Sequence, residues 1–503
     1  MGSVLFVSID SLIRFRARRQ RIVHDRSRAW IAAMLLPLWL GVVAASASPA
    51  ASTARPLADR LSGVLGQPAF AGARIGVLVV RQRDGATIFA KEPDRLLIPA
   101  SNMKILTAIG ALSVFGPSHR FETRIMADRA PDSGGAIGQL EIIGGGDPVM
   151  NSEDWWRLAA DLHRAGLRRI EGDILVDDSL FDAKYWHPGW SGISARAYHA
   201  PVSALTANYG AFFIAVEPGS AAGDPVAVSI DPSIPYLRVV NRAKTGGPRS
   251  PSSLTVDPSR TAENVEVVDV AGQLQAGDAR DVFPRSVNDA ALYAGSVFAM
   301  QLEAVGIEIG GSVKRASKRL PVEIAKHEGR PLAEIVRLFM KYSNNSIAES
   351  LVKSLAVASG SVPGSWPAGM AALEGELGRL GLLTPGAVLV DGSGLSPQDR
   401  VSARMLVDAL RIGSDSFRFG PEFLSALPIA HRDGTLERRA TASAERIRAK
   451  TGLLSDQRVT TLSGLAELAD GELAVFSILL NAHPGGSSAA MDAVDRLAAE
   501  LTR

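Results

Sequence analysis

Residues 98–115 read IPASNMKILTAIGALSVF, and this stretch decides how the rest of the chain is interpreted. Its apolar residues recur at helical spacing, so it predicts a helix that Ser101 opens and that runs to about Phe115. Ser101 and Lys104 lie three residues apart, which places both side chains on one helix face within hydrogen-bonding reach. Such a serine becomes nucleophilic if burial or nearby positive charge keeps the lysine partly neutral, so that its amine can take the proton. The helix N-terminus adds backbone N–H groups that favour developing negative charge.

The S-x-x-K pattern is too short to identify a site alone, because the chain also contains it at Ser350 and Lys353. Two other short motifs supply partners for an active serine: an S-x-N at Ser343-Asn344-Asn345 and a K-T-G at Lys450-Thr451-Gly452. The hydroxyl and amide of the first can relay a proton and hold a substrate amide. The lysine and threonine of the second can bind a carboxylate, while its glycine lets the backbone approach the substrate.

Each partner motif also has a second copy, at Ser286-Val287-Asn288 and at Lys244-Thr245-Gly246. The Lys244 copy is followed by a Gly- and Pro-rich sequence unsuited to a central strand edge, whereas strand-like segments follow Lys450. Ser286 precedes a predicted helix instead of lying in a turn. Ser350 shares a helical region with the S-x-N motif, so that pair could not close around a substrate. Only the remaining set, in the order S-x-x-K, S-x-N and K-T-G, places each motif in a suitable element.

These three motifs in this order resemble those of the penicillin-recognising serine enzymes, which comprise penicillin-binding proteins and serine β-lactamases. The long, mostly β stretch between the first two motifs is similar to the class C low-molecular-mass penicillin-binding proteins of the DacB type, which are D-alanyl-D-alanine carboxypeptidases/endopeptidases. The resemblance covers most of the chain from about residue 55 to 500. It includes three further segments: Gly144–Pro148 (GGGDP), Asp391–Ser396 (DGSGLS) and Asp433–Leu436 (DGTL). One departure is Asn344, where many relatives carry Asp.

The resemblance implies an α/β (α+β) fold: a β-lactamase/transpeptidase-like domain with an antiparallel sheet flanked by helices and interrupted by a large mostly-β insertion. The expected domains follow from this layout. A signal peptide or N-terminal membrane segment covers 1–47, and the insertion, of one or two subdomains, covers 121–289. The transpeptidase-like domain takes its first part from 55–120 and its second part from 290–503.

The resemblance also implies a mechanism. Ser101 would attack the carbonyl between two D-alanines of a peptidoglycan stem peptide, with Lys104 as general base and Ser343 passing the proton towards the leaving amine. The remaining site residues would bind the substrate: Asn345, Lys450, Thr451, Gly452 and Leu453. The backbone N–H groups of Ser101 and Leu453 would form the oxyanion hole. β-Lactams would acylate Ser101 as inhibitors, and neither a metal nor another cofactor would be needed.

Other functions fit the sequence less well. A β-lactamase or an S-x-x-K esterase would use the same serine chemistry, but neither would explain the long β stretch. A non-catalytic cell-wall binding protein would not explain three intact motifs. The histidines lack the spacing of a zinc peptidase, and a net charge of +2 gives no reason to expect a nucleic-acid partner. Asp178 and Asp182 are further candidates for recognising a charged side chain of the stem peptide.

The N-terminus indicates export. Seven arginines between Arg14 and Arg28 precede the uncharged run Ala29–Ala45, and Ala45-Ser46-Ala47 follows as an A-x-A pattern. This order is typical of a signal peptide and predicts a periplasmic or extracytoplasmic protein. The alternative is an uncleaved anchor with loose membrane association, for which the run is short against the about 20 residues that a span needs. The absence of cysteine suits an oxidising compartment.

Overall fold

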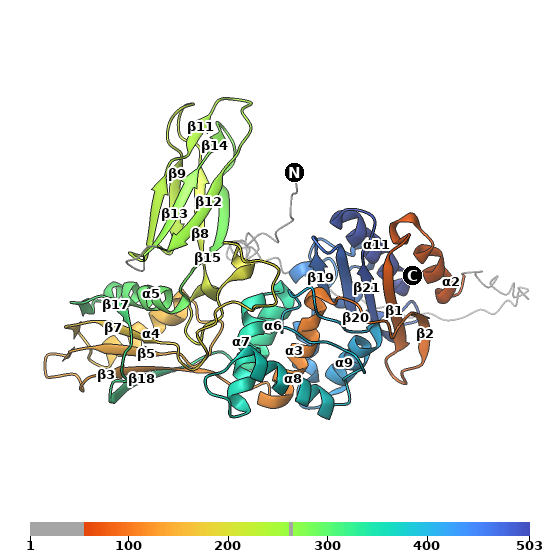
Figure 1. The fold of residues 1–503 in the computed structure, drawn as a ribbon, viewed down its shortest axis with the longest axis horizontal. Helices are drawn as coiled ribbons and strands as arrows, with labels where there is room; N and C mark the ends of the chain where they lie inside the picture. The colour runs from red at the N-terminus through yellow and green to blue at the C-terminus, as the bar shows by residue number, and fades with distance from the viewer. Residues whose placement is uncertain (1–54, 261–264) are drawn as a thin grey trace, which may run out of the picture.

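A five-stranded antiparallel sheet, built from both ends of the chain, carries the K-T-G motif on its edge strand (Figure 1). The structure is a computed structural model and describes residues 55–260 and 265–503. In spatial order the strands are β19 (Ile447–Leu454), β20 (Val459–Glu467), β21 (Leu473–Asn481), β1 (Arg74–Arg81) and β2 (Thr87–Lys91). Strands β1 and β2 pair antiparallel and form a hairpin through Arg83-Asp84-Gly85.

Helices cover both faces of this sheet, which is why its central strands are buried along almost their whole length. Side chains of β1 alternate between two cores: Val77 and Val79 pack with α2 (Leu57–Leu65) and α11 (Ser487–Ala499), while Leu78 packs on the opposite side. The opposite layer holds α3 (Met103–Phe115), α6 (Leu332–Tyr342), α7 (Asn345–Ala358), α8 (Trp366–Arg379), α9 (Ala403–Asp415) and α10 (Gly420–Ala426).

Helix α3 is the centre of that layer, and all of its residues from Met103 to Ser113 are buried. Its end at Phe115 matches the sequence prediction, but its start does not. Ser101 lies in a 3₁₀ turn, η2 (Ala100–Asn102), and the α-helix begins two residues later. The turn follows from Ala100, whose φ of 46° is left-handed and incompatible with an α-helical first turn.

Between the first two motifs the chain forms a second α/β unit. Its five-stranded mixed sheet runs β17 (Val313–Arg315), β7 (Ile174–Asp177), β5 (Leu140–Ile143), β3 (Glu122–Ala127) and β18 (Val322–Glu328). A small parallel sheet adds β16 (Glu308–Ile309), β6 (Arg169–Ile170) and β4 (Ala136–Ile137). Helices α4 (Ser152–Arg164) and α5 (Ala290–Ala304) bury their apolar residues in the same core.

The inserted unit continues past residue 289. Strands β17 and β18 pair with β7 and β3, and Phe298 of α5 packs against Trp155 of α4 at a ring separation of 5.1 Å. The core and sheet of the insertion would be incomplete without these elements, so we propose that the insertion ends near Glu328. Helix α5 precedes α6 to α10 in the chain but packs in the other core, so the change from strands to helices near residue 289 does not mark the end of the insertion.

A three-sheet arm projects from the inserted unit (Figure 1). Its first sheet holds β15 (Asp281–Ser286), β8 (Ala211–Glu217) and β9 (Ala227–Asp231). The second holds β10 (Leu237–Asn241), β13 (Glu266–Ala271) and β12 (Thr255–Arg260), and the third holds β11 (Lys244–Gly246) and β14 (Gln273–Gln275). The second K-T-G copy therefore forms a short strand at the far end of the arm.

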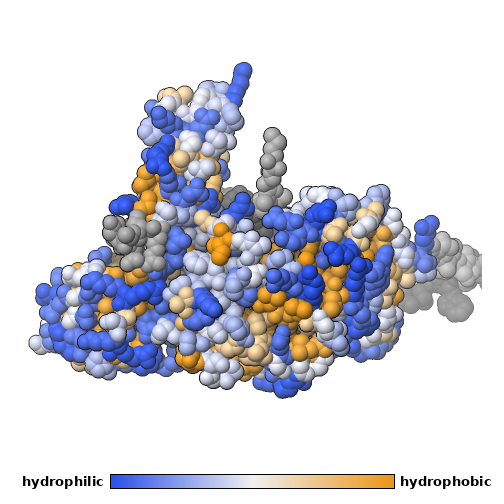
Figure 2. Space-filling model, viewed as in Figure 1, coloured by the Kyte–Doolittle hydropathy of each residue, from blue (hydrophilic) through white to orange (hydrophobic). Residues whose placement is uncertain are grey.

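On the face drawn in Figure 2, hydrophilic residues cover most of the lobe that carries β3, β5, β7 and β18. Ion pairs also join β3 and β18: Arg124 with Glu323 at 2.7 Å, and Lys326 with Glu122 at 3.1 Å. Within residues 55–260 and 265–503, no helix is long and apolar enough to cross a membrane.

Candidate active site

Ser101 and Lys104 meet as the spacing predicted. The Lys104 amine donates a hydrogen bond to Ser101 Oγ at 3.1 Å. Two more, both at 2.7 Å, reach Oδ1 of Asn345 and the carbonyl oxygen of Ser393. Lys104 is fully buried, whereas Ser101 is partly exposed. A reactant can therefore reach the hydroxyl while the amine stays shielded from water.

Burial lowers the pKa of Lys104 to about 8, against the opposing effect of the Asp391, Glu349 and Asp399 carboxylates. A lysine with its ordinary pKa would be almost entirely protonated near neutral pH and could not accept a proton. With the lowered value, a useful fraction of the amine is neutral. The pair thus has both the geometry and the acidity that a general base and its serine require.

The serine turn is held against the sheet by two hydrogen bonds. Asn102 Nδ2 donates to Ser463 Oγ on β20 at 2.7 Å, and Thr461 Oγ1 donates to the Pro99 carbonyl at 2.9 Å. On the neighbouring strand β19, a Cβ on Gly452 would lie 3.0 Å from the Ser101 backbone nitrogen. The K-T-G strand therefore passes directly beside the serine turn, and a side chain at position 452 would crowd it.

The S-x-N motif forms the turn between α6 and α7. Ser343 adopts a left-handed φ of 57° and ends α6, while Asn344 caps α7 by accepting a hydrogen bond from the Ile347 N–H at 3.0 Å. Asn345 is the first residue of α7. Besides accepting from Lys104, its amide donates to the Tyr198 carbonyl of the inserted unit at 3.0 Å.

Lys450 connects the second and third motifs. Its amine donates to Ser343 Oγ at 2.8 Å and to the Thr451 carbonyl at 2.7 Å. Burial lowers the pKa of Lys450 well below its ordinary value, and the nearby charges of Lys104 and Arg439 add to that effect. Thr451 Oγ1 donates to the hydroxyl of Thr435 at 2.8 Å. Leu453 follows the motif on β19 and is partly exposed.

The DGSGLS segment lies directly behind Lys104. The Asp391 carboxylate accepts the backbone N–H groups of Ser393 at 3.1 Å and Ser396 at 2.8 Å, and the Trp190 indole N–H at 2.9 Å. Sequence reasoning found this segment but missed the contact that matters, the Ser393 carbonyl on Lys104. It also missed Glu349, the Tyr198 carbonyl and Thr435. Backbone contacts and single buried carboxylates have no characteristic spacing, so only the DGTL and DGSGLS segments themselves were detectable.

The lysine of the second S-x-x-K copy, Lys353, has its partners outside the candidate site. The Lys353 amine donates to Asp182 Oδ1 at 2.7 Å and to the Lys184 carbonyl at 2.6 Å, and it lies 4.0 Å from the centre of the Trp366 ring. Lys353 is fully buried on α7, so this copy is part of the interface with the inserted unit.

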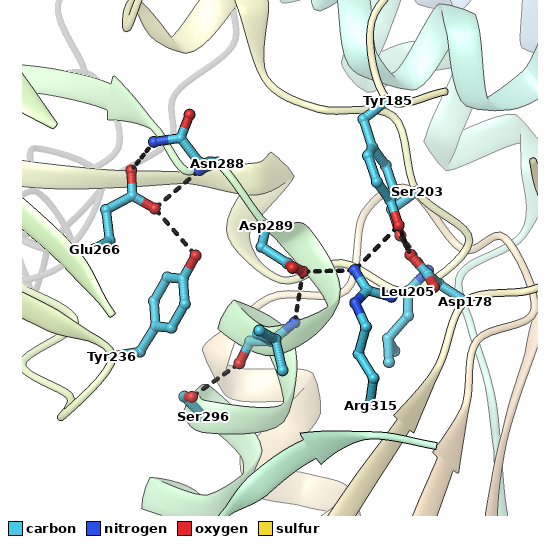
Figure 3. A network of polar contacts seen from close by, with 11 residues as sticks. Asp178, Tyr185, Ser203, Leu205, Tyr236, Glu266, Asn288, Asp289, Ser296 and Arg315 are labelled. Carbon is cyan, nitrogen blue, oxygen red and sulfur yellow. Dashed lines mark hydrogen bonds and ion pairs between the residues drawn. The ribbon is translucent and has the colours of Figure 1, made fainter. Parts of the chain in front are cut away.

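The two carboxylates considered for recognising a stem-peptide side chain both have internal partners. Asp182 holds Lys353, and Asp178 accepts hydrogen bonds from Arg315 at 2.7 Å and from Tyr185 at 3.0 Å. Figure 3 shows Arg315 lying between Asp178 and Asp289, the N-cap residue of α5. These contacts tie β17 and α5 to the loop after β7.

Comparison with known proteins identifies the family. The model of the D-Ala-D-Ala carboxypeptidase 3 (S13) family matches residues 57–501. The chain belongs to the S13 family. It is 35% identical to the D-alanyl-D-alanine carboxypeptidase of Actinomadura sp. (strain R39), over 95% of this chain and 90% of that protein. It is 25% identical to the D-alanyl-D-alanine carboxypeptidase DacB of Haemophilus influenzae, over 82% of this chain and 87% of that protein.

The fold of this S13 member agrees with solved structures. Penicillin binding protein 4 (dacB) from Haemophilus influenzae superposes with a TM-score of 0.74 at 24% identity, covering 87% of this chain and 97% of that one. The Bd0816 predatory endopeptidase from Bdellovibrio bacteriovorus superposes with a TM-score of 0.51 at 14% identity, covering 85% and 93%. The predicted family, fold class and enzyme class are therefore confirmed: the S13 chain is a serine-type D-Ala-D-Ala carboxypeptidase.

Proposed function

We propose that this carboxypeptidase cleaves peptidoglycan stem peptides through an acyl-enzyme on Ser101. One observation carries the proposal. Three motifs from separate parts of the chain meet in a continuous set of hydrogen bonds, with Lys104 on Ser101 at 3.1 Å and Lys450 on Ser343 at 2.8 Å. The other copies of these motifs lie on the arm, at the end of β15 or inside α7, where no such set forms among the described residues.

In the proposed acylation, the neutral Lys104 amine takes the Ser101 proton as Oγ attacks the carbonyl between the two D-alanines. The backbone N–H groups of Ser101 and Leu453 stabilise the oxyanion. The C–N bond then breaks, and the proton taken by Lys104 passes by way of Ser343 to the leaving amine of the terminal D-alanine, which leaves the lysine neutral again. Water, activated by the same lysine, hydrolyses the ester and restores the Ser101 hydroxyl.

The remaining residues bind the substrate in this proposal. Lys450 and Thr451 take the terminal carboxylate, and the buried Lys450 amine gains a negative partner that favours its charged form. Asn345 uses one amide N–H on the Tyr198 carbonyl and keeps a second for the acyl-side peptide. Gly452 lets β19 pass directly beside the serine turn, because a Cβ at this position would lie 3.0 Å from the Ser101 backbone nitrogen.

Intact-mass spectrometry with benzylpenicillin tests the nucleophile. We expect a stable one-drug adduct on the wild-type protein, lost in Ser101→Ala and retained in Ser350→Ala, the matched variant of the second S-x-x-K copy. Rapid drug hydrolysis without an adduct would favour a β-lactamase. A folded protein with neither adduct nor hydrolysis would contradict the enzymatic mechanism and favour a cell-wall binding role.

The proposal includes both trimming of terminal D-alanine and cleavage of D-Ala–diaminopimelate cross-links, as the family resemblance implies. Purified muropeptides separate the two activities. Pentapeptide monomers should lose D-alanine, and cross-linked dimers should fall to monomers, with both activities absent in Ser101→Ala. Dimers that persist while monomers are trimmed would restrict the enzyme to carboxypeptidase activity.

We also propose a periplasmic or extracytoplasmic location, directed by residues 1–47, which lie outside the described part of the structure. Peptidoglycan is assembled in that compartment, so the substrate requires export. N-terminal sequencing of protein purified from cells should begin after Ala47. Recovery of the intact N-terminus in the membrane fraction would support the uncleaved anchor instead.

A further inference from the structure

Glu349 is a fully buried carboxylate one helical turn after Asn345 on α7. Its two oxygens accept three hydrogen bonds. Oε1 accepts the backbone N–H of Ser393 at 2.8 Å. Oε2 accepts the N–H of Gly392 at 3.2 Å and the indole N–H of Trp366 at 2.8 Å. A buried carboxylate with this many donors is costly to replace and holds its donors in place.

The backbone that Glu349 holds is the same backbone that orients Lys104. The carbonyl of Ser393 accepts from the Lys104 amine at 2.7 Å. From the opposite side, Thr107 Oγ1 on α3 donates to the Gly392 carbonyl at 2.7 Å. The loop is thus clamped between α3 and α7, and the position of one carbonyl on Lys104 depends on a carboxylate that does not itself touch the lysine.

The charged groups around Glu349 and the Gly392–Ser393 backbone come from four parts of the chain. The carboxylates of Asp391 and Asp399 lie on the loop, and the cation of Lys353, bound by Asp182, lies over Trp366. Lys450 on β19 faces Lys104. His187 packs against the Trp366 ring at 5.1 Å, and burial lowers its pKa. Burial, followed by the charge of Asp391, raises the pKa of Glu349 to about 7.

We propose that Glu349 is a positioning residue for the general base: its carboxylate fixes the Ser393 carbonyl that directs the Lys104 amine at Ser101, and its negative charge acts on that amine. The inference rests on the proposed role of Lys104. It assigns to α7 a second contribution to the site besides Asn345. It also explains why a carboxylate lies fully buried behind the site with no cation bonded to it among the described residues.

The test is the pH dependence of acylation by benzylpenicillin in Glu349→Gln. Glutamine cannot accept all three N–H groups, because its amide nitrogen is itself a donor. We expect the maximal acylation rate to fall about 10-fold or more, since the amine loses its fixed direction. Removing an anion near Lys104 also destabilises its ammonium form. The acid limb of the plot of acylation rate against pH should therefore move to lower pH by on the order of one unit.

Two matched variants separate the effect of Glu349 on the position of the Lys104 amine from the effect of its negative charge. Thr107→Val removes the hydrogen bond on the other side of the loop and leaves every charge in place, so its rate should fall without movement of the acid limb. Asp147→Asn removes a buried carboxylate from the inserted unit, where burial raises the pKa to about 6, and should leave the acid limb at its wild-type position.

A wild-type acid limb in folded Glu349→Gln, or an equal limb shift in Thr107→Val, would overturn the inference. If thermal unfolding shows that Glu349→Gln does not fold, Glu349→Asp decides. Its shorter side chain withdraws from Ser393 but keeps the negative charge, so the acylation rate should fall while the acid limb stays at its wild-type pH. An unchanged acylation rate would refute the positioning role of Glu349. A wild-type protein that benzylpenicillin does not acylate would remove the proposed mechanism and this inference together.

Discussion

In the proposed mechanism Lys104 controls the pH at which the site becomes active, because only its neutral amine can take the Ser101 proton. Burial lowers its pKa to about 8. Acylation by benzylpenicillin should therefore rise as pH increases through about 8 and then level off, as the ammonium fraction disappears. Lys104→Arg should show no acylation at any pH, since a guanidinium stays protonated. A flat pH profile in the wild-type protein would argue against Lys104 as the base.

Lys450 and Lys244 allow a matched test of carboxylate binding, because both stand in the same R-A-K-T-G sequence. Lys450 is fully buried beside Ser343, whereas Lys244 is exposed on the arm. Lys450→Ala should slow acylation by about 100-fold, since loss of a buried charged partner costs about 2–5 kcal/mol. Lys244→Ala should match the wild-type rate. Equal rates in both variants would place the carboxylate elsewhere.

At the scale of single elements, the turn between α6 and α7 explains why Asn344 can replace the Asp of many relatives. Its side chain accepts from Ile347 N–H as a helix cap, a task that Asp performs equally well. Asn344→Asp should keep both stability and acylation, while Asn344→Ala should lose about 1 kcal/mol of unfolding free energy. Urea unfolding measures the second effect. A loss of acylation in Asn344→Asp, with the fold intact, would give this side chain a chemical role.

Sequence pattern predicted the helix after Ser101. Its end at Phe115 agrees with the structure, while its start lies two residues later than predicted. The three motifs also predicted which serines and lysines lie together, because each motif is local and its residue types are chemically specific. Their catalytic roles stay predictions.

Sequence pattern could not identify the groups that the motif residues contact. The 3₁₀ turn at Ser101 depends on the left-handed Ala100, which no propensity favours. The Ser393 carbonyl that Lys104 contacts and the N–H groups that Glu349 accepts from residues 392 and 393 belong to the backbone, so the side-chain types at 392 and 393 give no sign of them. The proposed boundary near residue 328 rests on pairing between β18 and β3, strands far apart in the chain.

At the scale of the whole molecule, the inserted unit contacts the candidate active site directly. The Trp190 indole bonds Asp391, and the Tyr198 carbonyl bonds Asn345. Trp190→Phe keeps the ring but removes a hydrogen bond to a carboxylate, worth about 1.5–3 kcal/mol. Its melting temperature and acylation rate should both fall.

Trp156→Phe is the matched control, because the Trp156 side chain on α4 is half exposed, at 51%. It should behave as wild type in both measurements. An unchanged acylation rate in Trp190→Phe would mean that the inserted unit contacts the site without influencing it.

The sheet that joins both ends of the chain also sets when the enzyme becomes active during its biosynthesis. Strand β1 pairs with β21, and the neighbouring strands β20 and β19 bring Lys450 to the serine turn. A nascent chain holds Ser101 and Lys104 early, but the candidate site stays incomplete until β19, β20 and β21 have been made. Fragments released by premature termination before β19 would therefore carry Ser101 and Lys104 without the strand that holds Lys450. In the proposed mechanism, a hydrolase of the cell's own wall thus stays inactive until these strands have been synthesised.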